Sequence, residues 1–139
     1  MINRKNQIWC VVGLLTLVLS GCRPAHQRDT APVRGRVTLD GAPVTSGFVI
    51  VTPEIGRMAK GIIQSDGSFT MGTYNANDGV QLGKHPVVVH PVPADEGGSF
   101  KHPPGPSIPE QYGVSSRSGL EIDVTPEGID NLNIELRSN

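Results

Sequence analysis

The chain has 139 residues, with 12 basic and 13 acidic side chains and a formal net charge of −1. Its length suits one domain with a hydrophobic core. No stretch is rich in Lys and Arg, which argues against binding to nucleic acid and against an electrostatic membrane patch. The two cysteines, Cys10 and Cys22, both lie near the N-terminus. We therefore expect no disulfide in the folded domain.

The first 21 residues have the pattern of an export signal. Arg4 and Lys5 precede an apolar run of 12 residues from Ile8 to Leu19. A membrane-spanning helix needs about 20 apolar residues, so this run is too short to span a bilayer. A positive start, a short apolar run and small residues are typical of a cleaved signal peptide. We predict cleavage after residue 21, which leaves 118 residues with a formal charge of −3.

The cleavage region has a specific order, in which Leu19, Ser20 and Gly21 stand directly before Cys22. This order resembles a bacterial lipobox. The resemblance implies cleavage before Cys22, a diacylglycerol on its thiol and acylation of the new amine. Because two or more acyl chains hold a protein stably, we predict a lipid anchor at Cys22 that keeps the domain outside the cytoplasm. A plain secretory signal is the alternative.

The membrane that holds the lipid is either the cell membrane or the outer membrane. By analogy with Gram-negative bacteria, Arg23 after the lipidated cysteine, in place of Asp, favours the outer membrane. Residues 22–32 are polar and without apolar periodicity, so we predict a flexible tether there.

The folded domain is expected to begin with a strand at 33–39. Val33, Gly35, Val37 and Leu39 are expected to face one side and Arg34, Arg36 and Thr38 the other, which is the period of a half-buried strand. The following Asp40-Gly41 pair suits a tight hairpin turn. Six further strands are expected at 47–52, 58–64, 68–71, 84–90, 120–124 and 132–136. In the last two, the apolar residues Leu120, Ile122, Val124, Leu132, Ile134 and Leu136 are expected to face inward. Seven short strands predict an all-β fold, a seven-stranded antiparallel Greek-key-type β-sandwich over residues 33–137.

A long loop is expected at 91–118, because this segment has no sustained alternation and holds six of the 12 prolines. Loops of this length are usually functional or disordered. Phe100 and Tyr112 lie within it, and we expect both to pack against the sheet. Phe100, His102 and Tyr112 are our candidate interaction residues. PPII segments around the prolines are an alternative reading of this loop.

Six short motifs follow one another in an order that resembles a known family of domains. They are Gly35–Val44, Gly47–Pro53, Asp66–Phe69, Gly83–Val89, Ile108–Tyr112 and Ser118–Leu120. Together they resemble the transthyretin-like, carboxypeptidase-regulatory-like domains of small lipoproteins that are abundant in planctomycetes. The resemblance implies a β-sandwich and no defined activity. Pro86 departs from the pattern, since proline cannot donate to a strand ladder, so its strand should start after it or lie at an edge.

No pattern of catalytic or metal-binding residues is present. The histidines, His26, His85, His90 and His102, have no metal-ligand spacing. Asp66-Gly67 and Asp78-Gly79 are single acids before glycine, which favours turns over a calcium loop. No Gly-x-Ser-x-Gly elbow occurs. We expect no cofactor and no metal.

The resemblance raises one enzyme class, the hydroxyisourate hydrolases. These end in Tyr-Arg-Gly-Ser, whereas this chain ends in Arg137-Ser138-Asn139 after Leu136, so we reject that activity. We expect a non-catalytic, membrane-anchored module that binds a protein partner in the cell envelope or has a structural role. A glycan-binding module is the alternative, with Tyr74 and Tyr112 as the only tyrosines for a sugar platform.

Overall fold

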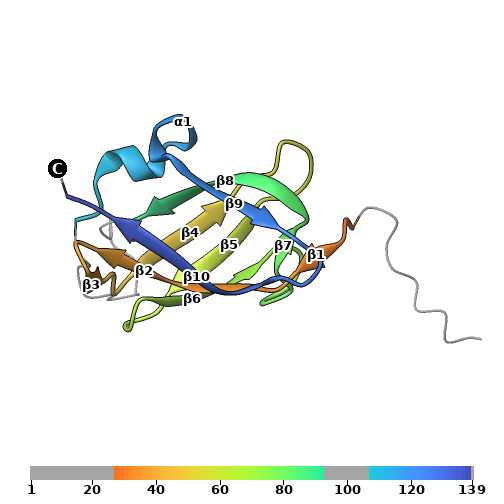
Figure 1. The fold of residues 1–139 in the computed structure, drawn as a ribbon, viewed down its shortest axis with the longest axis horizontal. Coiled ribbons are helices and arrows are strands. Elements are labelled where there is room, and N and C mark those ends of the chain that lie inside the picture. The colour runs from red at the N-terminus through yellow and green to blue at the C-terminus, as the bar shows by residue number, and fades with distance from the viewer. Residues whose placement is uncertain (1–26, 93–106, 139) are drawn as a thin grey trace, which may run out of the picture.

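Figure 1 shows a computed structural model of the chain, which describes residues 27–92 and 107–138. Several predictions fall outside these residues: the signal peptide, the lipobox residues Leu19, Ser20 and Gly21, the anchor at Cys22, and the loop residues Phe100 and His102. Within the described residues, no helix is long and apolar enough to cross a membrane.

The described residues form an all-β fold with two short helical segments. In chain order, the elements are β1 (Thr30–Ala31), β2 (Val33–Leu39), β3 (Ala42–Pro43), β4 (Gly47–Val51), β5 (Ala59–Ile63), β6 (Ser68–Gly72), β7 (Val80–Gln81), β8 (Gly83–His90), η2 (Glu110–Gly113), α1 (Ser115–Ser118), β9 (Leu120–Val124) and β10 (Ile129–Leu136). All seven expected strands are present, with end shifts of a few residues. The short strands β1, β3 and β7 were not expected.

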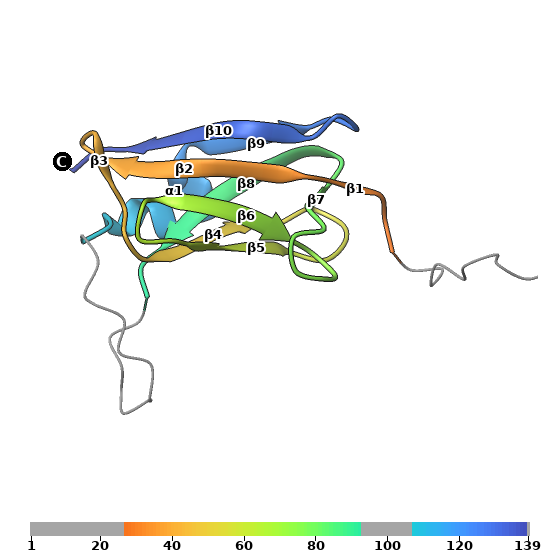
Figure 2. The same ribbon diagram turned by 90° about the horizontal axis from the view of Figure 1, so that it is seen from below.

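The strands form one curled sheet in the order β10-β2-β6-β5-β4-β8-β9, with β3 beside β2 and a separate β1-β7 pair. Figure 2 shows how the curl brings β10 and β2 over β6, β5 and β4, so that the fold is sandwich-like. One expectation is corrected, because β10 pairs with β2 in parallel while the other strand pairs are antiparallel.

The core lies between the two layers and comes from the inward positions of alternating strands. Its aliphatic members include Val33, Val37, Val49, Val51, Val87, Val89, Ile122, Val124, Ile134 and Leu136. Each buried side chain of this size stabilises the fold by about 1.5–3 kcal/mol relative to exposure. Alternation predicted the inward positions of β2, β9 and β10, because every second side chain of a strand faces the same side.

Turns predicted from glycine pairs are present in the structure. Asp40 and Gly41 have positive φ angles of 51° and 84° between β2 and β3, as a type I′ hairpin turn requires. Between β5 and β6, the Asp66 carboxylate accepts hydrogen bonds from the backbone and the hydroxyl of Ser68 at 3.0 and 2.6 Å. The Asp66-Gly67 pair therefore serves a turn, as the sequence indicates.

The domain begins earlier than the sequence indicates. The predicted tether reaches residue 32, but Thr30 and Ala31 pair with Gln81 and Val80 of β7, and Ala31 is buried. Two residues are too few to show a period, which is why this strand escaped prediction. Thr30 and Ala31 are therefore part of the folded domain.

The second part of the predicted loop is packed against the domain. Ile108 and Tyr112 belong to the hydrophobic core, and the Tyr112 hydroxyl accepts a hydrogen bond of 3.0 Å from the backbone N–H of Arg137. The Ser118 hydroxyl donates to the Val87 carbonyl oxygen at 2.8 Å. The expected packing of Tyr112 is therefore confirmed.

Strand β8 includes Pro86, whereas the sequence analysis placed it before the strand or at an edge. Pairing with β9 runs from Gly83 to Val87, but pairing with β4 stops at Val87. Pro86 therefore lies inside β8, opposite Glu121 of β9 and one residue beyond the β4 ladder, which corrects the expectation that the strand starts after it or lies at an edge.

Candidate functional site

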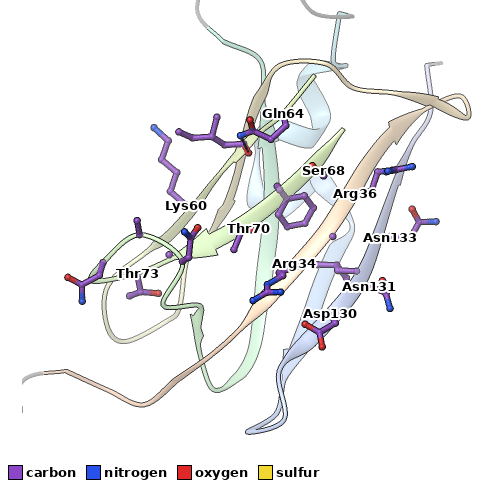
Figure 3. A pocket seen from close by; sticks show the side chains of 18 of the residues that line it. Arg34, Arg36, Lys60, Gln64, Ser68, Thr70, Thr73, Asp130, Asn131 and Asn133 are labelled. Carbon is purple, nitrogen blue, oxygen red and sulfur yellow. Dashed lines mark hydrogen bonds between the residues drawn. The ribbon is translucent and has the colours of Figure 1, made fainter. Parts of the chain in front are cut away.

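A shallow groove of about 1040 Å³ crosses the outer face of β10, β2, β6 and β5 (Figure 3). The loop between β6 and β7 forms one end of it, and the start of β10 lies at the other. Its lining combines polar and charged side chains, from Arg34, Arg36, Lys60, Gln64, Ser68, Thr70, Thr73, Tyr74, Asn75, Asp130, Asn131 and Asn133, with apolar surface from Ile62, Phe69, Ala76 and Leu132. The groove gathers side chains from four strands and the β6–β7 loop into one hollow, and we take it as the candidate site.

The strand registers align polar side chains in a row across four strands. Asn133 of β10 lies opposite Arg36 of β2, and Arg36 lies opposite Ser68 of β6. The backbone N–H of Gln64 then donates to the Ser68 carbonyl oxygen at 2.8 Å. Neighbouring strands lie about 4.8 Å apart, so this row presents amide, guanidinium and hydroxyl groups over about 15 Å.

A second row of side chains lies two residues away along the same strands, and it ends in apolar side chains. Arg34 of β2 lies opposite Thr70 of β6. The antiparallel register of β5 and β6 continues this row with Ile62, which lies opposite Phe48 of β4. Ile62 is 58% exposed, so the row changes from polar to apolar along its length.

The groove carries a net positive charge on a protein whose formal charge is negative. Its lining holds three cationic side chains, Arg34, Arg36 and Lys60, and one carboxylate, Asp130. Arg36 lies 3.9 Å from Asp66, with both side chains more than half exposed, and such surface pairs contribute little. Among the described residues, Arg34 has no ion pair within 4 Å.

Lys60 is held at the side of the groove by an aromatic ring. Its Nζ lies 3.7 Å from the centre of the Phe48 ring on the neighbouring strand. A cation–π contact at an exposed site contributes about 0.5–1 kcal/mol. The contact holds the ammonium group near Ile62, where charge and apolar surface meet.

The loop at one end of the groove is fixed by Asp78. Its carboxylate accepts hydrogen bonds from the backbone N–H groups of Thr73, Tyr74 and Asn75 at 2.6, 3.0 and 2.8 Å. Partial burial would raise the pKa of the Asp78 carboxyl, but these hydrogen bonds outweigh burial and hold the pKa below its ordinary value. Asp78-Gly79 is therefore the turn that the sequence indicates, and it also positions the groove wall.

Tyr74 extends from this loop with its ring half-buried. Its hydroxyl accepts a hydrogen bond of 3.0 Å from the backbone N–H of Arg28. This contact joins the groove to the segment that leads toward the N-terminus. Of the two tyrosines considered for a sugar platform, Tyr112 is buried in the core and Tyr74 lines the groove.

Of the three interaction candidates predicted from the sequence, the structure describes only Tyr112, and it lies outside the groove. Tyr112 lies in η2, outside the groove lining, and its hydroxyl already accepts a hydrogen bond from the backbone N–H of Arg137. His85 is buried, with Nε2 2.8 Å from the Gln81 carbonyl oxygen, while His90 is half-buried on the opposite face of β8. Over residues 27–92 and 107–138, no group of three or more His, Cys, Asp or Glu side chains could hold a metal ion.

Sequence analysis missed the groove residues as a site. Arg34 and Arg36 were predicted only as outward positions of β2. The available signal was a pair of basic residues on one face of a strand in a chain of negative charge. Without the strand order, nothing linked that pair to Ser68, Thr70 or Asn133.

Comparison with protein-family models, with curated proteins and with solved structures gives no match to this chain. The groove must therefore be interpreted from its own chemistry.

Proposed function

We propose that this protein is a non-catalytic binding module of the cell envelope, anchored by lipid on Cys22, and that the polar groove is its ligand surface. The groove is the observation that carries the proposal, because it gathers side chains from four strands into one open surface of about 1040 Å³. Open grooves with many donors suit a polymeric partner that lies across a surface, in contrast to the enclosed pockets that hold small molecules.

The chemistry of the groove favours binding over catalysis. Its lining holds Ser and Thr hydroxyl groups, but no His, and Asp130 is the single carboxylate among the described lining residues. A hydroxyl nucleophile needs an adjacent base. The Ser68 hydroxyl donates to the Asp66 carboxylate at 2.6 Å, but this contact closes the turn between β5 and β6, and the Thr73 hydroxyl donates to the Gly79 carbonyl oxygen at 2.7 Å. The proposal therefore assigns the module no reaction, hydroxyisourate hydrolysis included.

The proposed anchor and location derive from the sequence. The order of Leu19, Ser20, Gly21 and Cys22 after a short apolar run supports lipidation. The proposed fold family is the transthyretin-like, carboxypeptidase-regulatory-like group, and the all-β, sandwich-like architecture is compatible with it. We propose a Greek-key sandwich exposed outside the cytoplasm, on the cell membrane or the outer membrane.

A glycan is the second candidate ligand, and one observation favours it. The amide and hydroxyl groups of the groove can both donate and accept hydrogen bonds, as sugar hydroxyl groups require, and Tyr74 supplies part of an aromatic surface. However, the burial of Tyr112 leaves Tyr74 without the second tyrosine that a two-ring platform would need. A protein partner is therefore our first choice.

Two measurements in cells test the proposal. Mass spectrometry of the mature N-terminus should find acyl groups on Cys22, and the protein should partition into detergent, whereas Cys22→Ser should abolish both. A photoreactive amino acid at Thr70, inside the groove, should crosslink a defined envelope protein. The same group at Asp123, which is exposed on β9, is the matched control. Equal crosslinking from both positions, or a water-soluble product with another N-terminus, would refute the proposal.

A further inference from the structure

We infer that the groove recognises an acidic protein segment in extended conformation, with carboxylates on alternate residues that bind Arg34 and Arg36. The inference rests on the proposed function and specifies its ligand class. It combines the charge of the groove, the spacing of its cations and the change from polar to apolar surface across the sheet.

The charge of the groove selects an anion. The described lining contains three cations and one carboxylate, while the whole chain has a formal charge of −1. Opposite potentials steer a partner to a site and fix its orientation. The groove is thus a local basic surface on an acidic molecule, and an acidic partner would be repelled elsewhere but attracted here.

The two arginines are available to a ligand. Both are exposed, and Arg36 has only a long, exposed contact with Asp66 at 3.9 Å. A carboxylate from a ligand can replace that contact at little cost, because exposed ion pairs are weak. Guanidinium groups bind carboxylates through two parallel hydrogen bonds, which a lysine cannot form.

The spacing of these arginines selects an extended peptide. Arg34 and Arg36 are two residues apart on β2 and face the same side of the sheet. Their positions are therefore about 6.6 Å apart, at a rise of about 3.3 Å per residue. An extended peptide spaces its alternate side chains by the same distance, so a segment lying along β2 would present one carboxylate to each arginine.

The neighbouring residues complete the fit to a peptide. Ser68 and Thr70 on β6 and Asn133 on β10 flank the two arginines. The Ser68 hydroxyl already donates to Asp66 at 2.6 Å, and the Asn133 amide nitrogen donates to Glu135 at 2.9 Å. The oxygens of both side chains can still accept from the backbone N–H groups of a ligand, and the Thr70 hydroxyl can donate or accept. Exposed Ile62 offers a contact for an apolar side chain, which an acidic polysaccharide does not carry.

Fluorescence anisotropy with labelled peptides tests the inference, using the full lipidated protein in detergent micelles. The probe is a hexapeptide with Glu at its second and fourth residues and Val at its third and fifth. One control peptide has the two Glu residues adjacent, and another has Gln in their place. We expect the alternating peptide to bind about tenfold more tightly than the adjacent isomer, and the Gln peptide not to bind.

Variants locate the binding on the groove. Arg34→Gln and Arg36→Gln should each weaken binding of the alternating peptide about tenfold, as expected when a charge-assisted hydrogen-bonded pair is lost at an exposed site. Arg117→Gln, on α1 and outside the groove lining, is the matched control, because its exposed guanidinium pairs with Glu110 at 3.8 Å. Binding should also weaken as the salt concentration rises. All three variants remove exposed charges, and their thermal unfolding should match that of the parent chain.

Three results would overturn the inference: equal binding of the alternating and adjacent peptides, no loss in Arg34→Gln and Arg36→Gln, or displacement of the peptide by polygalacturonate at lower concentration than by unlabelled peptide. The last result would assign the groove to an acidic glycan. Crosslinking from Thr70 separates this failure from that of the proposed function. A groove-specific crosslink without peptide binding keeps the module but rejects its acidic ligand, while the absence of both rejects both.

Discussion

Asp78 offers a sharp test of how the groove wall is built. Its carboxylate closes the turn after β6 by accepting three backbone hydrogen bonds, from Thr73, Tyr74 and Asn75. Asp78→Asn keeps the size of the side chain but replaces one acceptor oxygen with an NH₂ group that cannot accept. At least one backbone N–H then loses its partner, and the remaining hydrogen bonds lose their charge.

The expected cost follows from the number and exposure of these bonds. A hydrogen bond to a charged group contributes about 1.5–3 kcal/mol. Because Asp78 is only half-buried, we take the lower end and expect Asp78→Asn to lower the free energy of unfolding by about 2 kcal/mol at pH 7. For a domain of this size, that loss corresponds to a fall in Tm of about 8 °C.

The pH dependence gives a second, independent readout. The pKa of Asp78 is lowered in the folded state, so its stabilisation is fully present above the unfolded pKa of about 3.9 and is lost as the pH falls through the lower folded pKa. The difference in stability between the parent chain and Asp78→Asn should therefore be constant from pH 7 to about pH 5. It should shrink as the pH falls below about 4, because the parent carboxylate becomes protonated.

Urea unfolding of the full chain at several pH values, followed by circular dichroism, measures this difference. Asp123→Asn is the matched control, since Asp123 is exposed on β9 and should change stability by less than about 0.5 kcal/mol. Asp66 and Glu127 also have a lowered pKa, but both are present in each variant and their effects cancel in the comparison. A difference that stays the same at pH 7 and pH 2.5 would refute the role assigned to the Asp78 carboxylate.

Two further substitutions test contacts that hold the sandwich together. Gly35→Ala should lower the free energy of unfolding by about 2–3 kcal/mol, because its Cβ would lie 2.1 Å from the Leu132 carbonyl oxygen on β10. The control Gly119→Ala should cost only about 1 kcal/mol, since Gly119 has a left-handed φ of 64° but open space around its Cβ. Equal costs of the two substitutions in thermal unfolding would contradict the close approach of β2 and β10. Tyr112→Phe should lower the free energy of unfolding, measured with urea, by about 1 kcal/mol, because it removes the 3.0 Å hydrogen bond with Arg137. Tyr74→Phe should lower it by less, because the hydrogen bond of the Tyr74 hydroxyl is exposed. The reverse order would contradict the packing of η2 against the sheet.

Much of the fold is predictable from alternation, because a half-buried strand must place its apolar residues on one side. This is why β2, β9 and β10 were predicted with their inward faces correct. The same logic fails for β1 and β7, which have two residues each and no period to detect. It also fails for η2 and α1, because a four-residue helix has no amphipathic repeat.

The alternation of apolar and polar residues predicts where the strands lie, but not which strands pair with each other. The parallel pairing of β10 with β2 joins the two ends of the domain, and the period of each strand is the same whichever way its neighbour runs. The groove depends on that pairing, since Asn133 reaches Arg36 only because β10 lies beside β2. The sequence therefore predicted that Arg34 and Arg36 face outward, but not what lies beside them.

The proposed anchor and the groove are linked by chain length. Arg28 donates its backbone N–H to the Tyr74 hydroxyl at the end of the groove, and it lies six positions after Cys22. A chain spans at most about 3.3–3.6 Å per residue, so these six residues reach no further than about 22 Å. If Cys22 carries the lipid, the Tyr74 end of the groove stays within about 22 Å of the membrane surface. A partner in the groove must therefore approach the lipid headgroups, which favours a membrane-associated protein over one that diffuses far from the bilayer.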